Sequence, residues 1–375
     1  MDGTGEHTDR AYFIVPILGS RGTRCMSIYA VIAGGGVKVN FATGCVCRLK
    51  RMNSPVLHDL DVVSGVSAGG ILASAISAGQ DIQNYYNKFA TTAFVEPTNK
   101  CVVVSRALSM YTGHRQAFYN SEELTSTLDE LVGKKLVTGA NMLRVHAVDT
   151  ATGKQYPFTM ARNTEIDVKP IVASCSIAGL FPPVQLDGKT FVDGGMTTSN
   201  FPMSDIKEGI RNPNTKVMLI CACEPWMARI PNVNSSSLTQ QFRGIATNLL
   251  PLWRHYLKEL DHWHLMDTLD IEHAAVPDGR FMALYRRHPH GLELLQLMQP
   301  GHKRNPGVSH DLAVLFFAPT TAEYNNAETI NLTDQPNVRK STTDAMMAKG
   351  KAAAAEINML ADTIGLGWKR HLTFI

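Results

Sequence analysis

The sequence predicts an α/β protein with a mostly parallel central sheet and helices on both of its faces. Two short apolar runs, residues 26–33 and 57–64, have the composition of buried strands. Each is followed by a glycine-containing turn and a helical stretch. Repeated strand–helix–strand units of this kind place their strands side by side and parallel. At 375 residues, the chain is long enough for one or two domains around such a sheet.

Further elements follow along the chain. After the first strand we expect a helix over residues 37–52, and after the second strand a tightly buried helix of small residues that begins near residue 71. The remaining apolar runs predict strands at residues 143–148, 216–221 and 312–317. Helical patterns cover residues 121–132 and 344–360, the latter rich in alanine.

The segment between Pro225 and Pro306 differs in composition from the rest of the chain. It contains seven of the 13 histidines and three of the four tryptophans. We therefore expect residues 1–25 to be an N-terminal extension and residues 26–375 to be one domain. A helical or mixed insertion, or cap, is expected at about residues 226–306.

Composition excludes several functional classes. Hydrophobic residues make up 44% of the chain and charged residues 18%, as in ordinary globular proteins. The 36 Lys and Arg residues nearly balance the 33 Asp and Glu residues, so nucleic acid is not an expected partner. Seven cysteines, two pairs of them spaced C-x-C, indicate a reducing compartment rather than a zinc or disulfide site. With the polar start MDGTGEHTDR in place of a signal peptide, we expect a cytoplasmic location.

Two long uncharged stretches, residues 62–80 and 170–186, could be mistaken for membrane spans. The first contains four serines and four glycines, and the second contains three prolines. A transmembrane helix needs about 20 predominantly apolar residues, so neither stretch qualifies.

The first stretch contains the motif Gly65-x-Ser67-x-Gly69 directly after a predicted strand and before a predicted helix. This pattern is typical of a nucleophile elbow, a strained turn that raises a reactive serine hydroxyl above the sheet. Small residues two positions either side of the serine allow the helix to pack back on the strand. The alternative is a glycine-rich turn with a surface serine.

A second glycine motif can supply an oxyanion hole. Gly34, Gly35 and Gly36 end the first predicted strand, at the same sheet edge as Ser67, so their backbone N–H groups can face the serine. Lys38, at the start of the next helix, adds favourable charge for an anion. A dinucleotide-binding loop is ranked low, because Val39 stands where its third glycine is required.

Three further blocks follow: DTATG at residues 149–153, ASCSIAGLFPP at 173–183 and FVDGG at 191–195, with Asn200 and Pro202 beyond them. In this order, all these motifs closely resemble the patatin-like phospholipase family over about residues 28–224. The resemblance implies a three-layer fold and makes residues 26–375 an acyl hydrolase domain.

The resemblance implies a serine acyl hydrolase, a phospholipase A or related lipid acyl hydrolase, that works through a dyad without histidine. Ser67 is then the nucleophile, Asp193 the general base, and an acyl-enzyme the intermediate. This chemistry needs no cofactor and no metal. The expected partner is a phospholipid or other acyl lipid, met by peripheral contact with a membrane. Four glycines shape the two catalytic turns: Gly65, Gly69, Gly194 and Gly195.

The chain departs from the family pattern at a few positions. Val39 replaces a glycine of the first motif, and Ser176 and Ala178 replace the alanine and proline of the third block. None of these residues supplies a reactive atom, so we expect activity to be retained.

Two alternative functions remain open. A Ser-His-Asp esterase of the α/β-hydrolase type fits the chain order Ser67, Asp193 and then His255 or His310. A catalytically inactive lipid-binding protein could use the same fold.

The histidine-rich segment raises two weaker hypotheses. His262 and His264, with Asp261 or Asp267, have ligand types that suit zinc or manganese, although ordinary histidines are the more frequent explanation. A stripe of apolar residues at helical spacing is expected to pack on the core and is alternatively a membrane-surface helix. Its members are Phe242, Ile245, Leu249, Trp253, Tyr256, Leu260 and Trp263.

Overall fold

A computed structural model places most of the central part of the chain. It describes residues 27–57, 60–91, 105–106, 108–110, 112, 114, 116–196, 199–225, 264–272, 275–303, 305, 307–324 and 336–363.

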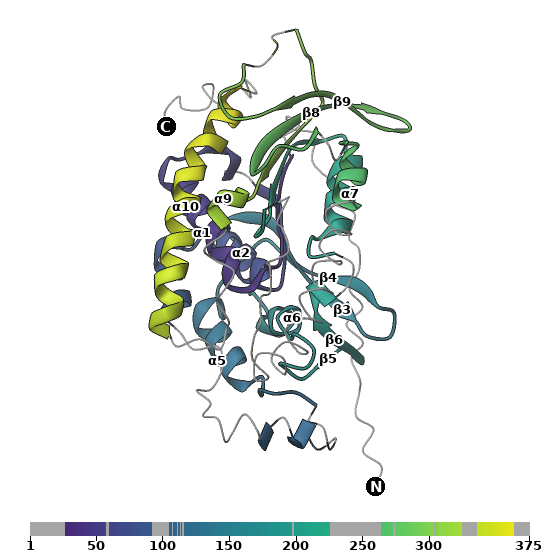
Figure 1. The fold of residues 1–375 in the computed structure, drawn as a ribbon. Coiled ribbons are helices and arrows are strands. Elements are labelled where there is room, and N and C mark those ends of the chain that lie inside the picture. Colours follow the sequence, from purple (N-terminus) through teal and green to yellow (C-terminus); the bar gives the residue numbers. More distant parts are fainter. Residues whose placement is uncertain are drawn as a thin grey trace, which may run out of the picture.

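One mixed sheet of ten strands organises the fold (Figure 1). Its strands are β1 (Ser27–Ile32), β2 (Leu60–Val66), β3 (Ala140–Asp149), β4 (Lys154–Ala161), β5 (Val184–Leu186), β6 (Lys189–Asp193), β7 (Thr215–Cys221), β8 (Arg280–His288), β9 (Gly291–Met298) and β10 (Leu312–Phe317). The strand order is β5-β6-β3-β2-β1-β7-β10-β8-β9, and β4 pairs with β3.

The centre of this sheet is parallel and its margins are antiparallel. The neighbouring strands β3, β2, β1, β7 and β10 all run in the same direction. Antiparallel pairs extend the sheet beyond β3 and beyond β10. Central parallel strands are covered on both faces, which is why β1 and β10 are continuous apolar runs without alternation. The predicted fold class is confirmed.

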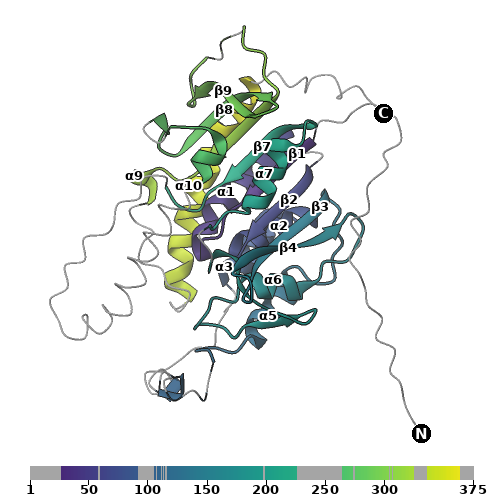
Figure 2. The same ribbon diagram turned by 90° about the vertical axis from the view of Figure 1, so that its right-hand side faces the viewer.

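Helices cover both faces of the sheet, as Figures 1 and 2 show. One face packs against α1 (Asn40–Arg51), α2 (Ala68–Ser77), α3 (Ile82–Thr91), α5 (Glu122–Leu131), α6 (Val168–Ser174) and α10 (Pro336–Thr363). The other face packs against α7 (Met203–Arg211) and a short helix at residues 264–269. The short elements η1 (Gly36–Val39) and α9 (Thr321–Tyr324) lie beside the ends of the central strands.

Helices α1 and α10 approach each other at backbone distance. A Cβ atom added at Gly44 of α1 would meet the carbonyl of Met347, and one added at Gly350 of α10 would meet the carbonyl of Phe41. A glycine on each helix therefore permits this contact, which joins the two ends of the described chain.

Part of the expected insertion belongs to the central sheet. β8 pairs with β10, and β9 pairs with β8 through the two-residue turn at Pro289 and His290. Residues 281–285 of β8 are apolar and buried on both faces of the sheet, and this hydrophobic burial incorporates the hairpin into the sheet. Residues 226–263, with the whole apolar stripe from Phe242 to Trp263, lie outside the described residues.

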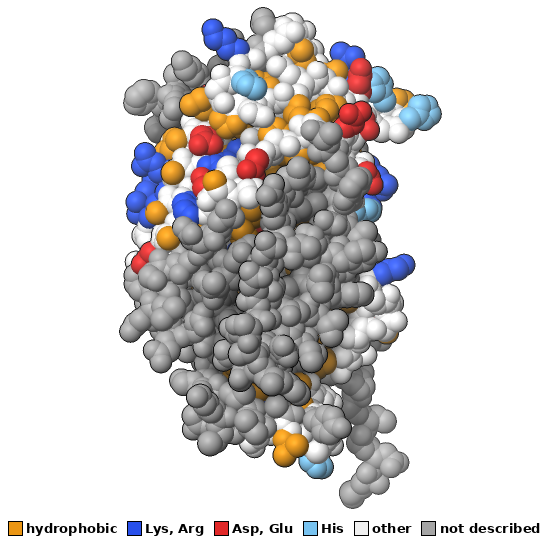
Figure 3. Space-filling model, in the orientation of Figure 1, with side chains coloured by type: hydrophobic (Ala, Val, Ile, Leu, Met, Phe, Trp, Pro, Cys, Tyr) orange, Lys and Arg blue, Asp and Glu red, His pale blue; other side chains and the backbone are white. Residues whose placement is uncertain are grey.

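Among the helices that the structure describes, none combines the length and the apolar character required to cross a bilayer. On the face seen in Figure 3, side chains of both charge signs are interspersed where the surface is described. This mixture agrees with the near balance of charge in the sequence.

Candidate active site

Ser67 occupies the turn between β2 and α2 in a backbone conformation that is rare for a residue with a side chain. Its φ is 54° and its ψ is −130°. Ser67 stands at the N-cap position of α2, yet its hydroxyl makes no capping hydrogen bond. The predicted elbow geometry is therefore present, and the strained turn keeps the hydroxyl available for other chemistry.

The two glycines of the elbow are required by close backbone contacts. A Cβ at Gly65 would meet the backbone of Gly69, and a Cβ at Gly69 would meet the carbonyl oxygens of Ile32 and Ala33. Any side chain at either position would push α2 away from β1 and β2.

The glycine loop after β1 lies directly beside the elbow. A Cβ at Gly34 would come within 3.3 Å of the Cβ of Ser67. The N–H of Gly34 already donates to the carbonyl of Asn200, at 2.9 Å. The N–H groups of Gly35 and Gly36 make no such bond within the described chain, so they are the loop donors that remain for an oxyanion.

The side chain of Lys38 is engaged away from the glycine amides. Its Nζ lies 2.5 Å from Glu224 Oε1 and 4.9 Å from the ring centre of Tyr324. The hydroxyl of Tyr324 also donates to Glu224 Oε1, at 3.0 Å. Lys38 thus forms an ion pair with Glu224, which follows the end of β7.

Asp193 ends β6 at the level of Ser67 in the sheet. Val66 pairs with His146, and Ala147, the next residue of β3, pairs with Asp193. Ser67 and Asp193 therefore flank Ala147 from opposite sides, about two strand spacings or 10 Å apart between Cα atoms. Directly paired residues point to the same sheet face, so Asp193 projects with Ala147 toward the α6 side.

The carboxylate of Asp193 is buried, with 4% of the residue exposed. Its Oδ1 accepts a hydrogen bond from the N–H of Gly195, at 2.7 Å. Within the described chain the hydroxyl of Ser67 makes no hydrogen bond, so it is not bonded to Asp193 in this structure. Catalytic hydrogen bonds often tighten only when substrate binds.

The two glycines that follow Asp193 are also tightly enclosed. A Cβ at Gly194 would meet the carbonyl of His146 and lie 2.9 Å from Cγ1 of Val66, and a Cβ at Gly195 would meet Oδ1 of Asn200. The predicted tight turn after Asp193 is thus packed against the strand that carries the elbow.

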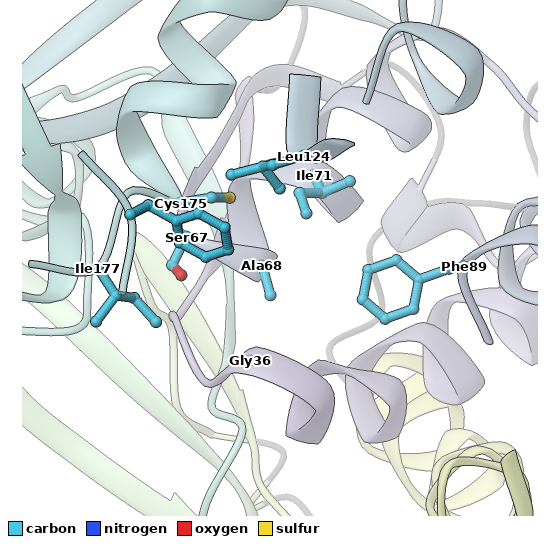
Figure 4. A pocket seen from close by; sticks show the side chains of 9 residues that line it. Gly36, Ser67, Ala68, Ile71, Phe89, Leu124, Cys175 and Ile177 are labelled. Carbon is cyan, nitrogen blue, oxygen red and sulfur yellow. The ribbon is translucent and has the colours of Figure 1, made fainter. Parts of the chain in front are cut away.

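An apolar pocket opens at Ser67 (Figure 4). It encloses about 420 Å³ of empty space, counting the part open to solvent. The Ser67 hydroxyl lies on one side of this space and the ring of Phe89 lies across it. The lining residues are Gly36, Ser67, Ala68, Ile71, Phe89, Leu124, Cys175, Ile177 and Phe181.

Cys175 provides an electrostatic link between this pocket and Asp193. Burial raises the pKa of the Cys175 thiol well above its usual value, and the negative charge of Asp193 raises it further. The thiol is therefore protonated and unreactive, and it serves as part of the apolar wall.

A buried ionic cluster lies on the opposite, α7 side of the sheet. His146 Nε2 lies 2.7 Å from Asp205 Oδ2, and Arg144 donates to Asp205 Oδ1 at 2.7 Å. Burial alone would raise the pKa of Asp205, but its hydrogen bonds and charge interactions with His146 and Arg144 outweigh burial and lower it. His146 pairs with Val66, the residue before Ser67, but its ring points to the α7 side of the sheet and thus faces away from the pocket.

The histidines proposed from the sequence as a catalytic base or as metal ligands do not approach Ser67 where the structure describes them. His310 precedes β10, at the end of the sheet opposite to Ser67. His264 is exposed and its Nε2 lies 3.3 Å from Lys207 Nζ. His255, Asp261 and His262 lie outside the described residues. Among the described residues, no group of three or more potential metal ligands is assembled.

Residues 30–206 match the sequence model of the patatin-like phospholipase family. These residues are a patatin-like phospholipase domain. The match covers the glycine loop, the elbow and Asp193, and it confirms the predicted family. The patatin-like domain therefore carries every residue predicted for the dyad and the oxyanion hole.

Two solved structures are similar to this chain at low identity. VipD from Legionella pneumophila is 12% identical, with a TM-score of 0.38 over 88% of this chain and 66% of VipD. Human GIVD cytosolic phospholipase A2, in complex with methyl gamma-linolenyl fluorophosphonate, is 10% identical, with a TM-score of 0.41 over 91% of this chain and 60% of that one. The chain thus spans less than two thirds of each. No curated protein sequence matches it.

Two contributions to the patatin-like site were not predicted. Asn200 was noted only as a motif residue, but its carbonyl holds the glycine loop. The pocket wall also takes side chains from α3 and α5, Phe89 and Leu124, which carry no motif. Only the tertiary fold brings these apolar residues to Ser67.

Proposed function

We propose that this chain is a serine acyl hydrolase that cleaves fatty-acyl esters of phospholipids or other glycerolipids through Ser67 and Asp193. The observation that carries the proposal is the strained Ser67 turn opening onto an otherwise apolar pocket. The family match over residues 30–206 supports a lipid acyl hydrolase.

In the first step, the ester carbonyl lies at Ser67 with its acyl chain in the apolar pocket. Asp193 accepts the proton of the Ser67 hydroxyl as its oxygen attacks the carbonyl carbon. The N–H groups of Gly35 and Gly36 stabilise the negative charge that develops on the carbonyl oxygen. The amino end of α2, which begins at Ala68, adds a favourable dipole.

The tetrahedral intermediate then collapses. The bond to the leaving alcohol breaks as Asp193 returns the proton to it, and the acyl group stays on the oxygen of Ser67. Water attacks this acyl-enzyme, with Asp193 again accepting the proton. The bond between the acyl carbon and the Ser67 oxygen then breaks, Asp193 returns the proton to that oxygen, and the fatty acid is released. Each step uses only a carboxylate, a hydroxyl and backbone amides.

The composition of the pocket supports an acyl chain as the part of the substrate that is recognised. Burial of each methylene group contributes about 0.8 kcal/mol, so an apolar pocket of this size favours long chains over acetate. A substrate of this kind is presented by a membrane or micelle, and peripheral contact with such a surface is part of the proposal.

The disposition of the histidines that the structure describes favours the dyad over a Ser-His-Asp triad. The ring of His146 is engaged by Asp205 on the α7 side, and His310 lies at the opposite end of the sheet. Neither can accept the proton of Ser67 without rearrangement of the sheet.

The test is mass spectrometry of the products from a mixed panel of phospholipids and neutral lipids. Parent protein, Ser67→Ala and Asp193→Asn are compared at equal concentration. The parent is expected to release fatty acid and both variants to lose activity by at least about 10³-fold. Ser64→Ala is the matched control, because Ser64 is a fully buried serine of β2 that lies outside the elbow.

Equal release by the parent and by both variants would refute the site. Loss of activity in His255→Ala or His310→Ala to the level of Ser67→Ala would favour the triad. A parent that binds lipid but neither releases fatty acid nor reacts with a fluorophosphonate at Ser67 would favour the inactive lipid-binding protein.

A further inference from the structure

We infer that Ser174 is a positioning residue that fixes the elbow and sets the spacing between Ser67 and Asp193. This inference rests on the proposed acyl hydrolase function. Ser174 is the last residue of α6 and is completely buried beneath the turn. Its hydroxyl does not line the pocket, so it acts through the backbone of Ser67 rather than on substrate.

The hydroxyl of Ser174 joins two separate elements. It accepts a hydrogen bond from the backbone N–H of Ser67, at 2.8 Å, and donates one to the carbonyl of His146, at 2.6 Å. The elbow is thereby tied to β3, the strand between Ser67 and Asp193. Both bonds are shielded from water, so neither is exchanged for a solvent contact.

The same short segment also holds Asp193. The N–H of Asp193 donates to the carbonyl of Ser176, at 2.8 Å. Residues 174–176 therefore bond to the backbone of both members of the dyad. Because the hydroxyl of Ser67 makes no hydrogen bond to Asp193 in the structure, this shared support, and not a direct bond, sets their spacing.

The conformation of Ser67 explains why such support is needed. A positive φ at a residue with a side chain persists only where its surroundings hold it in place. The carbonyl of Ser67 is held from the other side by the N–H of Gly70, at 2.8 Å. The Ser174 bond is thus the restraint on the N–H side of the strained residue.

The strand that receives the Ser174 hydrogen bond is itself anchored. The side chain of His146 is held by Asp205 on the α7 side of the sheet, with both residues almost completely buried. The backbone carbonyl of His146 is therefore held in place. Because the Ser174 hydroxyl bonds to this carbonyl and to the N–H of Ser67, it fixes the elbow relative to β3.

The test compares Ser174→Ala with Ser77→Ala. Both serines are fully buried, but Ser77 is the last residue of α2, away from the elbow, and its hydroxyl makes no hydrogen bond within the described residues. The measurements are kcat and KM for a p-nitrophenyl acyl ester, the rate of Ser67 labelling by a fluorophosphonate, and the thermal midpoint. A displacement of about 1 Å in a catalytic group can cost about 100-fold in rate.

We expect Ser174→Ala to lower kcat and the labelling rate by about 10- to 100-fold, with KM within about twofold of the parent. Ser77→Ala should keep kcat within about twofold at a similar thermal midpoint. Equal kcat in the two serine variants, in an active parent, would overturn the inference. An inactive and unlabelled parent would instead overturn the proposed function.

A second variant covers the case in which Ser174→Ala does not fold. Ser174→Cys keeps the shape of the side chain but replaces the hydroxyl by a much weaker donor and acceptor. The expected result is a folded protein with kcat lowered by at least about fivefold and KM unchanged. Full parental kcat in Ser174→Cys would contradict the positioning role.

Discussion

Lys38 Nζ lies 2.5 Å from Glu224 Oε1, which links η1, the short element before α1, to the segment that follows β7. Both side chains are about one-fifth exposed, so the pair is shielded from solvent on most sides. The pair spans the glycine loop, which lies between β1 and α1. Lys38 therefore holds this loop in place, and its charge is already matched before any substrate binds.

This arrangement predicts different results for two changes in the loop. Lys38→Met should lower kcat by less than about tenfold, because the backbone amides and not the ammonium group meet the oxyanion. Gly35→Ala should lower kcat by about 100- to 1,000-fold, because the new Cβ would meet Cys223 and displace a donor. Steady-state kinetics with a soluble acyl ester measures both effects.

Gly307→Ala is the matched control for Gly35→Ala, since a Cβ at Gly307 meets only the side chain of Asn305 at an ordinary distance. A Lys38→Met variant as inactive as Gly35→Ala would show that the ammonium group acts directly on the anion.

The pocket predicts that Leu124→Phe shortens the acyl chain that the enzyme accepts. The larger ring would occupy space that chain methylenes need, at about 0.8 kcal/mol for each one excluded. Loss of four methylene contacts would lower kcat/KM for long-chain esters by about 100-fold, with little change for butyrate. A series of p-nitrophenyl esters of increasing length measures the shift.

Leu131→Phe provides the comparison, because Leu131 is buried on the same helix, two turns further on, and does not line the pocket. A parallel loss of activity for every ester length would point to general overpacking of α5 instead.

The Asp205 cluster predicts a pH-dependent contribution to stability. Because interactions with His146 and Arg144 hold the pKa of Asp205 below its usual value of about 4, its stabilisation is complete above that pH. It is lost as the pH falls through the lower pKa of the folded state. Asp205→Asn should therefore lower the free energy of unfolding by about 3–5 kcal/mol at pH 7.

Urea unfolding measures this difference, which should shrink as the pH is lowered to about 3. Glu208→Gln is the control, since Glu208 also pairs with Arg144 but its side chain is 46% exposed. This variant should lower the free energy of unfolding by at most about 1 kcal/mol. A difference between the parent and Asp205→Asn that is constant with pH would contradict the ionic role of Asp205.

Cys175 offers a probe of the charge on Asp193. The carboxylate raises the pKa of the thiol, so Asp193→Asn should lower that pKa and speed alkylation by iodoacetamide severalfold at pH 8. Burial, the larger cause, remains, so the thiol should still react more slowly than a free cysteine. Mass spectrometry of the peptide containing Cys175 follows the reaction, with Ser67→Ala expected to react at the parental rate.

The sequence predicted the parallel centre of the sheet better than its margins. Strands buried on both faces, such as β1 and β10, are apolar runs that stand out from the rest of the chain. The hairpin of β8 and β9 was assigned to an insertion, because the segment that contains it is rich in histidine and tryptophan. The turn at Pro289 and His290, between two mainly apolar stretches, was the available indication of a hairpin.

At the site, the glycines and Ser67 were predictable because a turn that excludes side chains leaves a pattern in the sequence. The engagement of Lys38 by Glu224 was not predictable, since those two residues are 186 positions apart and the contact depends on β7 lying beside β1. The hydrogen bonds of Ser174 depend in the same way on the position of α6 beneath the elbow.

The backbone contact between α1 and α10 has a consequence for how the protein is made. Translation produces α1 long before α10, so the face of α1 around Phe41 and Gly44 stays uncovered until the residues of α10 have left the ribosome. A nascent chain at that stage exposes apolar surface, the condition under which chains aggregate or recruit chaperones. Docking of α10 is therefore a late step that follows the formation of the elbow in sequence order, and yield during expression depends on it.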